Sequence, residues 1–174
     1  MGEFIFNRGR SKTAHSYPEA PRGGSPLTAF ARNFAAGPAT DTAVPTAGIE
    51  IPWGLIYSGA SPGVNIPITP RATGRIRVSS VIAIKNNSDA TQRVTIVVRI
   101  GAIELAFPFL EANSIEAGGV EMIPVLAETL VGEALPLGAS VNARIFITST
   151  DDTDVELVGL NSTIEVQEVP IPTG

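Results

Sequence analysis

Two runs of alternating apolar and polar residues place the strongest constraint on this 174-residue chain. Residues 75–85 place four apolar side chains on one face: Ile76, Val78, Ile82 and Ile84. Residues 93–100 do the same with Val94, Ile96, Val98 and Ile100. A period of two is typical of an antiparallel strand with one face in the core. Because the turn-forming cluster Asn86–Asp89 lies between the runs, they are predicted to pair as a hairpin.

Shorter alternating segments follow as far as residue 169, and Val141–Thr148 is the clearest of them. Short strands separated by Gly, Asn and Asp turns are typical of an all-β sandwich or barrel. Pro124 interrupts the apolar run 120–126, and proline lacks the N–H that a central strand needs. This run is therefore expected at a sheet edge or a bulge. The sequence predicts an all-β, antiparallel fold of about 8–10 strands.

The first part of the chain has a different composition. Nine of the 14 prolines lie in residues 1–70, and Gly, Ala, Ser and Thr are frequent around them. No period of 2 or 3.6 is sustained there, and Pro-Gly segments interrupt regular structure. The sequence therefore predicts an extended N-terminal arm over 1–48 and a β-sandwich domain over 49–174.

Basic and apolar side chains along the arm indicate that it binds a surface. Residues 1–35 hold five basic and two acidic residues, a charge of +3, whereas the rest hold seven basic and fifteen acidic, a charge of −8. A solvated tail is the simpler alternative, but it gains nothing from four of the chain's seven phenylalanines. The predicted partner-binding residues are Phe4, Phe6, Arg8, Arg10, Arg22, Phe30, Arg32, Phe34 and Trp53.

Two local expectations concern the aromatic residues. Residues 28–36 are compatible with a short helical turn that brings Leu27, Phe30 and Phe34 to one face. Trp53 is the only tryptophan of the chain. It either lies in the core, where the arm enters the sandwich, or anchors an interface, where tryptophan is enriched.

Residues suited to catalysis or metal binding are sparse. The chain has no Cys and a single His, His15, which lies in the arm. Asp151, Asp152 and Asp154 suggest a calcium loop, but the spacing lacks the Gly and distal Glu of an EF-hand, so a solvated turn is the better interpretation. The expectation is a protein that is not an enzyme and has no metal or cofactor site. Nucleic-acid binding is disfavoured because the body is acidic, and it is left to the arm alone.

Targeting signals are not evident in the sequence. The first twelve residues carry charges throughout and contain no apolar stretch typical of a signal peptide. No window approaches the length of a membrane-spanning helix. Synthesis in a host cytoplasm and no membrane partner are the expectations.

Residues 70–169 also resemble a known family. The resemblance rests on Pro70–Ser79, Lys85–Ser88, Thr91–Ile96 and the closing Gly159–Val169. A glycine before a long strand and an Asn-rich turn after it are similar to the jelly-roll domains of the tumour-necrosis-factor-like type. The same style recurs in small structural proteins of tailed bacteriophages, including head-decoration and fibre-tip proteins. The resemblance implies an antiparallel jelly-roll β-sandwich.

Together with the arm, the resemblance implies a virion structural protein on the capsid surface. Such a protein would decorate or cement the shell by binding the major capsid protein or another virion protein. It would also bind neighbouring copies of itself, as a homotrimer. The alternative is a fibre-tip or carbohydrate-binding module whose loops at 86–89 and 151–154 hold the ligand.

Overall fold

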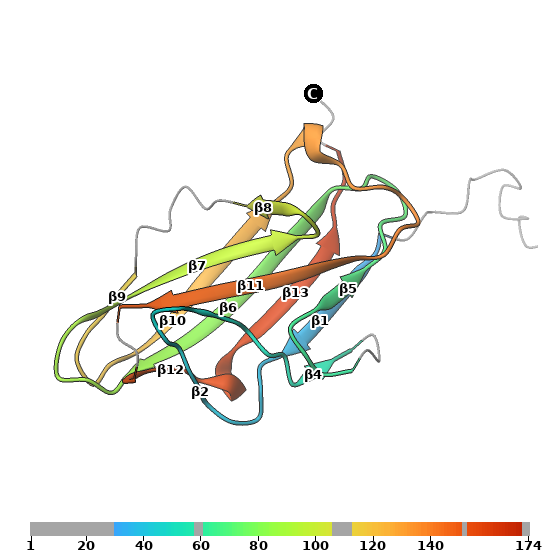
Figure 1. Ribbon diagram of the computed structural model, residues 1–174. Helices are drawn as coiled ribbons and strands as arrows, with labels where there is room; N and C mark the ends of the chain where they lie inside the picture. The colour runs from blue at the N-terminus through green and yellow to red at the C-terminus, as the bar shows by residue number, and fades with distance from the viewer. Residues whose placement is uncertain (1–29, 58–60, 106–112, 151–152, 172–174) are drawn as a thin grey trace, which may run out of the picture.

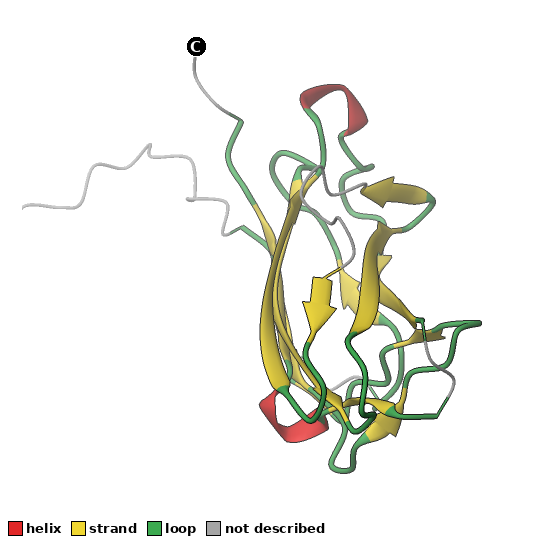
Figure 2. Ribbon diagram, turned by 90° about the vertical axis from the view of Figure 1, so that its left-hand side faces the viewer, coloured by secondary structure: helices red, strands yellow, loops and turns green. Residues whose placement is uncertain are grey.

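Two antiparallel sheets packed face to face make up the described part of the chain. The computed structural model describes residues 30–57, 61–105, 113–150 and 153–171. Within these ranges it contains thirteen strands and two short 3₁₀ turns, η1 (Val131–Glu133) and η2 (Gly159–Asn161). Figure 2 shows the two layers side-on, with the 3₁₀ turns at opposite ends.

Sheet A contains β6, the longest strand in the described residues, and β10, which pairs with β6 over nine residues. Its order is β2-β12-β6-β13-β1-β4, and β10 pairs with the other side of β6. The bounds are β1 (Arg32–Ala36), β2 (Thr42–Ala43), β4 (Leu55–Ile56), β6 (Ile76–Asn86), β10 (Val120–Glu128), β12 (Val155–Leu157) and β13 (Thr163–Glu168). In the described part of the chain β10 pairs only with β6, which confirms the edge position expected from Pro124.

Sheet B is built around β7 and β11. Its order is β3-β11-β7-β8, with β5 also pairing with β11 and β9 with β7. The bounds are β3 (Ile49–Glu50), β5 (Ile66–Ile68), β7 (Gln92–Ile100), β8 (Ile103–Leu105), β9 (Asn113–Ile115) and β11 (Val141–Ser149). The chain passes repeatedly between the sheets, so the predicted all-β, antiparallel jelly-roll sandwich is confirmed (Figure 1).

The predicted hairpin of residues 75–85 and 93–100 is wrong. These runs are β6 and β7, and they lie in opposite sheets. β6 pairs with β10, β12 and β13, whereas β7 pairs with β8, β9 and β11. Alternation fixes which side chains face the core but not which strand is the neighbour, and both runs have the same pattern. The cluster at 86–89 turns the chain from one sheet to the other.

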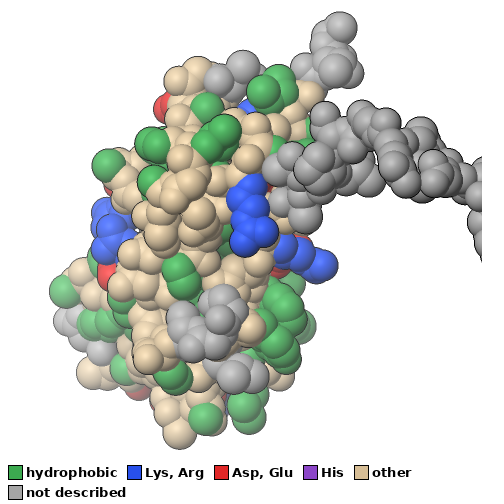
Figure 3. Space-filling model, turned by 90° about the vertical axis from the view of Figure 1, so that its right-hand side faces the viewer, with side chains coloured by type: hydrophobic (Ala, Val, Ile, Leu, Met, Phe, Trp, Pro, Cys, Tyr) green, Lys and Arg blue, Asp and Glu red, His purple; other side chains and the backbone are tan. Residues whose placement is uncertain are grey.

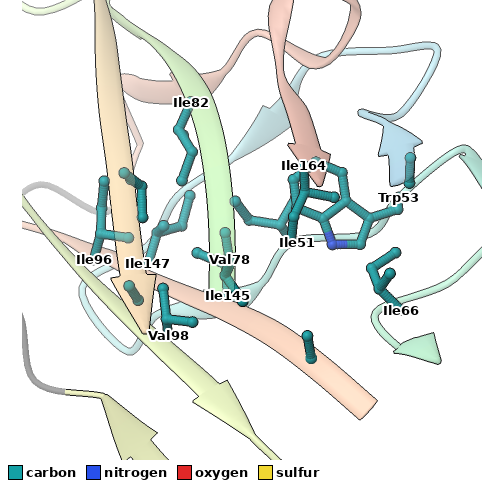
Figure 4. Close-up of a cluster of buried hydrophobic side chains, with 14 of the residues drawn as sticks. Ile51, Trp53, Ile66, Val78, Ile82, Ile96, Val98, Ile145, Ile147 and Ile164 are labelled. Atoms are coloured by element: carbon teal, nitrogen blue, oxygen red, sulfur yellow. The ribbon is translucent and has the colours of Figure 1, made fainter. Parts of the chain in front are cut away.

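Isoleucine and valine dominate the core between the sheets (Figure 4). The predicted inward residues of β6 and β7 are all buried, and Ile145 and Ile147 of β11 join them. β-Branched side chains suit strands because their stiff rotamers pack well on a pleated surface. Trp53 is 1% exposed and lies in this core beside Ile51 and Ile66. The core interpretation of Trp53 is therefore confirmed, and the tryptophan is unavailable to a partner.

Part of the expected arm belongs to the sandwich. Residues 32–36, expected in a helical turn, form β1, which pairs over five residues with β13. Asn33 and Ala35 point inward, and the Asn33 amide donates to the Pro67 carbonyl at 2.7 Å. Beyond β2, the fully buried Val44 donates from its backbone to the Val155 carbonyl. The arm predicted over 1–48 is thus corrected for residues 32–48, because their backbone and small side chains complete sheet A.

Candidate assembly interface

The outer face of sheet A, turned away from sheet B, exposes apolar side chains. On β10 the buried Ile123 and Val125 alternate with exposed Met122 and Leu126, which are 58% and 63% accessible. On β1 the buried Asn33 and Ala35 flank exposed Phe34 in the same way. β10 therefore carries apolar side chains on both faces, and β1 adds the exposed ring of Phe34 to the outer face, which a strand facing only water does not require.

Register brings these residues into one row across four strands. Leu126 lies opposite Ser79 of β6, Ser79 opposite Glu165 of β13, and Glu165 opposite Phe34 of β1. The next row contains Pro124, Val81 and Thr163. Leu126 and Phe34 thus stand on the two outer strands of these four, with Ser79, Val81, Thr163 and the charged Glu165 between them.

Two adjoining hollows follow from this arrangement. One, of about 550 Å³, lies over β10, β6 and β13, and the other, of about 300 Å³, lies over β13 and β1. They share Thr163 and Glu165. We call the combined feature the sheet A groove, defined by Phe34, Ser79, Val81, Leu126, Thr163 and Glu165.

An aromatic pair closes one end of the groove. The rings of Phe34 and Tyr57 stack with centroids 3.7 Å apart and planes 21° apart. The backbone N–H of Tyr57 donates to the Phe34 carbonyl at 2.9 Å and holds the two residues together. Phe34 remains 40% and Tyr57 58% exposed. A preorganised aromatic wall of this kind is typical of interface anchors.

Charges beside the groove are paired with one another. Arg32 Nε donates to Glu165 at 2.5 Å. Glu128 accepts hydrogen bonds from both Arg75 and Arg77, with the Arg77 contact at 2.9 Å. Figure 3 looks onto an edge of the sandwich, where a few basic side chains (blue) and small acidic areas (red) lie among apolar side chains (green). The ion pairs beside the groove therefore leave no separate field of one charge there.

The outer face of sheet B differs in character. Arg99 pairs with Glu104 at 3.3 Å and lies over the Phe146 ring at 5.3 Å. Arg144 pairs with Glu50 at 2.9 Å. The long arginine stems cover apolar surface on this sheet. Sheet A has no comparable cover over Leu126 and Met122 in the described residues, so the two faces of the sandwich are unequal.

A buried carboxylate fixes the strand that carries Phe34. Glu168 is 3% exposed, and its oxygens accept backbone N–H groups from residues 71–74 and from Ala31. Burial alone would raise the pKa of Glu168, but the N–H groups of residues 71–74 outweigh it and lower the pKa to about 2. The Glu168 N–H also donates to the Ala31 carbonyl at 2.7 Å. Glu168 thereby holds the start of β1 in place.

The predicted partner-binding residues fall into three groups. Phe30 and Phe34 are exposed, and Arg32 has a 65% exposed side chain. Trp53 is buried, as described above. The others lie outside the described residues: Phe4, Phe6, Arg8, Arg10 and Arg22. Arg32 and Phe34 lie side by side on β1 at the groove, whereas Phe30 lines a separate hollow with Arg71 and Pro67.

The prediction missed Tyr57, Met122 and Leu126. A signal for the last two was present in the sequence, because apolar residues occupy both alternating sets of the run 120–126. Tyr57 had no such signal. Its place beside Phe34 depends on the pairing of β1 with β4, which joins short segments that no periodicity marks.

The remaining features predicted from the sequence either have a structural role in the described residues or lie outside them. Asn86 is fully buried, and its amide donates to the carbonyls of Ala90, Ile115 and Glu116, so it shapes its loop. His15, Asp151 and Asp152 lie outside the described residues. The described residues contain no cluster of His, Cys, Asp or Glu suited to a metal ion. Among the same residues, no helix has the length and apolar character to cross a membrane.

Comparisons with known proteins give structural neighbours only. No family model matches the sequence, and no curated protein matches it. Among solved structures, Eiger TNF from S. frugiperda is 11% identical with a TM-score of 0.43, and 83% of this chain aligns with 96% of that one. A chain of the T13 IBDV viral particle is 10% identical with a TM-score of 0.48, and 80% of this chain covers 31% of it. The PRD1 vertex protein P5 is 11% identical with a TM-score of 0.39, with 82% and 99% covered.

Proposed function

We propose that this chain is a virion structural protein that decorates or cements a capsid. It binds the shell through the major capsid protein or another virion protein, and it binds neighbouring copies as a homotrimer. Its place is the capsid surface, after synthesis in the host cytoplasm. The observation that carries the proposal is the apolar outer face of sheet A. The arm leads in sequence into β1, which is part of this sheet.

The chemistry of this face supports binding. Leu126, Met122 and Tyr57 expose large apolar side chains at 58–63%. Because each is already partly covered, its burial contributes less than the roughly 1.5–3 kcal/mol of a fully exposed side chain, so several must be buried together. The neighbouring pairs, such as Arg32 with Glu165, are rim charges that fix orientation more than they add affinity.

The arm supplies a second, electrostatic contact. Arg8, Arg10 and Arg22 precede β1, and the remainder of the chain beyond residue 35 carries a charge of −8. A basic arm on an acidic body favours an acidic partner surface and turns the body away from it. We therefore assign the arm residues Phe4, Phe6, Arg8, Arg10 and Arg22 to contact with the shell.

Co-sedimentation with capsids purified without this protein tests the proposal. The full chain should bind saturably, and a variant lacking residues 1–29 should bind at least about tenfold more weakly. A tenfold weaker affinity requires the loss of only about 1.4 kcal/mol of binding free energy. A variant with Arg8, Arg10 and Arg22 changed to Gln is the matched control, which keeps the apolar anchors and should lose mainly the salt-sensitive part of the affinity. No binding by the full chain, or equal binding by all three forms, contradicts the proposal.

A further inference from the structure

We propose that the segment Phe4-Ile5-Phe6 of the same chain binds in the sheet A groove and covers it in the free protein. This inference rests on the proposed function in one respect, that the shell displaces the segment on assembly. In the described residues the groove is open and partly apolar, and the segment is a short, wholly apolar run at the far end of the arm. Docking would bring the three apolar side chains of the segment against the apolar residues of the groove.

The shape of the groove suits this segment. In an extended chain, alternate side chains share a face, about 6.5–7 Å apart. Phe4 and Phe6 therefore point the same way, as two rings side by side. The groove offers two adjoining hollows, of about 550 and 300 Å³, on either side of Thr163 and Glu165. One ring enters each hollow, between Leu126 at one end and the Phe34–Tyr57 stack at the other.

The charges allow this burial. Phe4, Ile5 and Phe6 carry no charge, and the first basic residue is Arg8. Glu165 is the one acidic side chain that lines the groove in the described structure, and it already pairs with Arg32 at 2.5 Å. Covering the groove therefore leaves no charge of its lining without a partner, and Glu3, the residue before Phe4, has to remain in solvent at the open end of the groove.

The length of the connecting chain favours an occupant from the same molecule. Residues 7–29 join the segment to Phe30 and span at most about 76 Å when extended. Phe34, which forms the groove wall, lies only four residues after Phe30. Residues 7–29 are thus much longer than is needed for the segment to reach the groove from Phe30. Such a tether gives an effective concentration of roughly millimolar, above that of neighbouring copies in dilute solution.

The absence of cysteine from the sequence gives a direct test by disulfide trapping. In the full chain, Phe6→Cys is combined with Leu126→Cys in the groove. The matched control combines Phe6→Cys with Thr95→Cys, an exposed site on the outer face of sheet B. Under mild oxidation the groove pair should form an intramolecular disulfide at least about tenfold faster than the control pair, reflecting docking rather than tethering alone. The rate should not depend on protein concentration below about 10 µM, as expected for an intramolecular reaction.

Removal of the apolar side chains separates docking from chance collision. Phe4→Ser and Ile5→Ser in the groove-pair variant should reduce the trapping rate to that of the control pair. Equal rates with and without these changes would overturn the proposal. Circular dichroism of each variant confirms the fold, so a trapping result is not confused with unfolding.

Two other occupants give distinct results. A mixture of the single variants Phe6→Cys and Leu126→Cys that forms mixed dimers in preference to the intramolecular disulfide would assign the groove to a neighbouring copy's arm and overturn the proposal. Rapid disulfide dimerisation of the Leu126→Cys variant alone would show that the groove of one copy packs against the groove of a second copy. That result would also overturn the proposal. The trapping experiment contains no capsid, so its failure does not bear on capsid binding. Failure of co-sedimentation likewise does not bear on docking of the segment in the groove.

Discussion

At the scale of single residues, Glu168 shows how one buried charge is stabilised. Its carboxylate is 3% exposed and receives four consecutive backbone N–H groups, from Arg71 to Gly74, at 2.6–3.0 Å. Hydrogen bonds to a charged acceptor are stronger than neutral ones. Glu168 thereby joins the loop before β6, the end of β13 and the start of β1. The position of Phe34 at the groove depends on this contact.

This environment predicts a pH dependence of stability. A carboxyl group whose pKa falls from 4.5 to about 2 on folding stabilises the fold fully above pH 4.5, and that contribution is lost as the pH falls through about 2. The loss amounts to about 3 kcal/mol in the free energy of unfolding. Urea unfolding between pH 7 and pH 2 measures it. Glu168→Gln should remove this dependence and destabilise the protein at pH 7, because its NH₂ group faces the N–H donors.

Glu165→Gln, on the same strand, is the matched control. Its ion pair with Arg32 is largely exposed, and such pairs contribute only about 0–1 kcal/mol. A Glu168→Gln variant as stable at pH 7 as the Glu165→Gln variant would contradict the assigned role.

At the scale of elements, β1 belongs to two regions at once. In sequence it continues a segment rich in Pro, Gly and Ala, whereas in space it pairs with β13 and with β4. Its inward residues are Asn33 and Ala35, which are small or polar and give no apolar alternation. Its outward Arg32 and Phe34 line the sheet A groove. The strand is therefore held by its neighbours rather than by its own propensity.

Two deletions distinguish an appended arm from an integral strand. Removal of residues 1–29 should lower the midpoint of thermal unfolding, followed by circular dichroism, by only about 2–4 °C, the contribution of the docked Phe4-Ile5-Phe6 segment. Removal of residues 1–35 also deletes most of β1 and leaves the backbone edge of β13 without its partner strand, so the midpoint should fall by roughly 10 °C or more, since 1 kcal/mol corresponds to about 2–4 °C in a domain of this size. Equal midpoints for both deletions would show that β1 does not stabilise the sandwich.

At the scale of the whole molecule, the outer faces of the two sheets differ in the apolar side chains that they expose. Both outer faces carry paired arginines, but sheet A also leaves Leu126 and Met122 exposed. The shared core between the sheets supplies the folding energy. Substitutions on the outer face of sheet A should therefore change association and leave stability intact.

A pair of substitutions checks this division. Ile145→Ala, at a fully buried site of β11, should lower the free energy of unfolding by about 2–5 kcal/mol. Leu126→Ser, at a site 63% exposed, should change it by no more than about 0.5 kcal/mol. Chemical unfolding of the full chain measures both. A large loss of stability in Leu126→Ser would show that Leu126 belongs to the core.

The sequence predicted correctly whatever depends on one strand at a time. The inward residues of β6, β7 and β11 follow from a period of two, because successive side chains of a strand point to opposite faces. Pro124 indicated the edge position of β10 because it lacks an N–H. These signals are local, and tertiary contacts did not alter them.

Pairing between distant segments was decided only by the tertiary structure. β6 and β7 look like a hairpin in sequence, yet they lie in opposite sheets, and β1 looks like arm yet completes sheet A. The sheet A groove is of the same kind, since Leu126, Ser79, Glu165 and Phe34 come from four strands. Alternation determines which face a side chain occupies. It carries no information about which strand lies alongside, because any strand of the same period offers the same backbone hydrogen bonds.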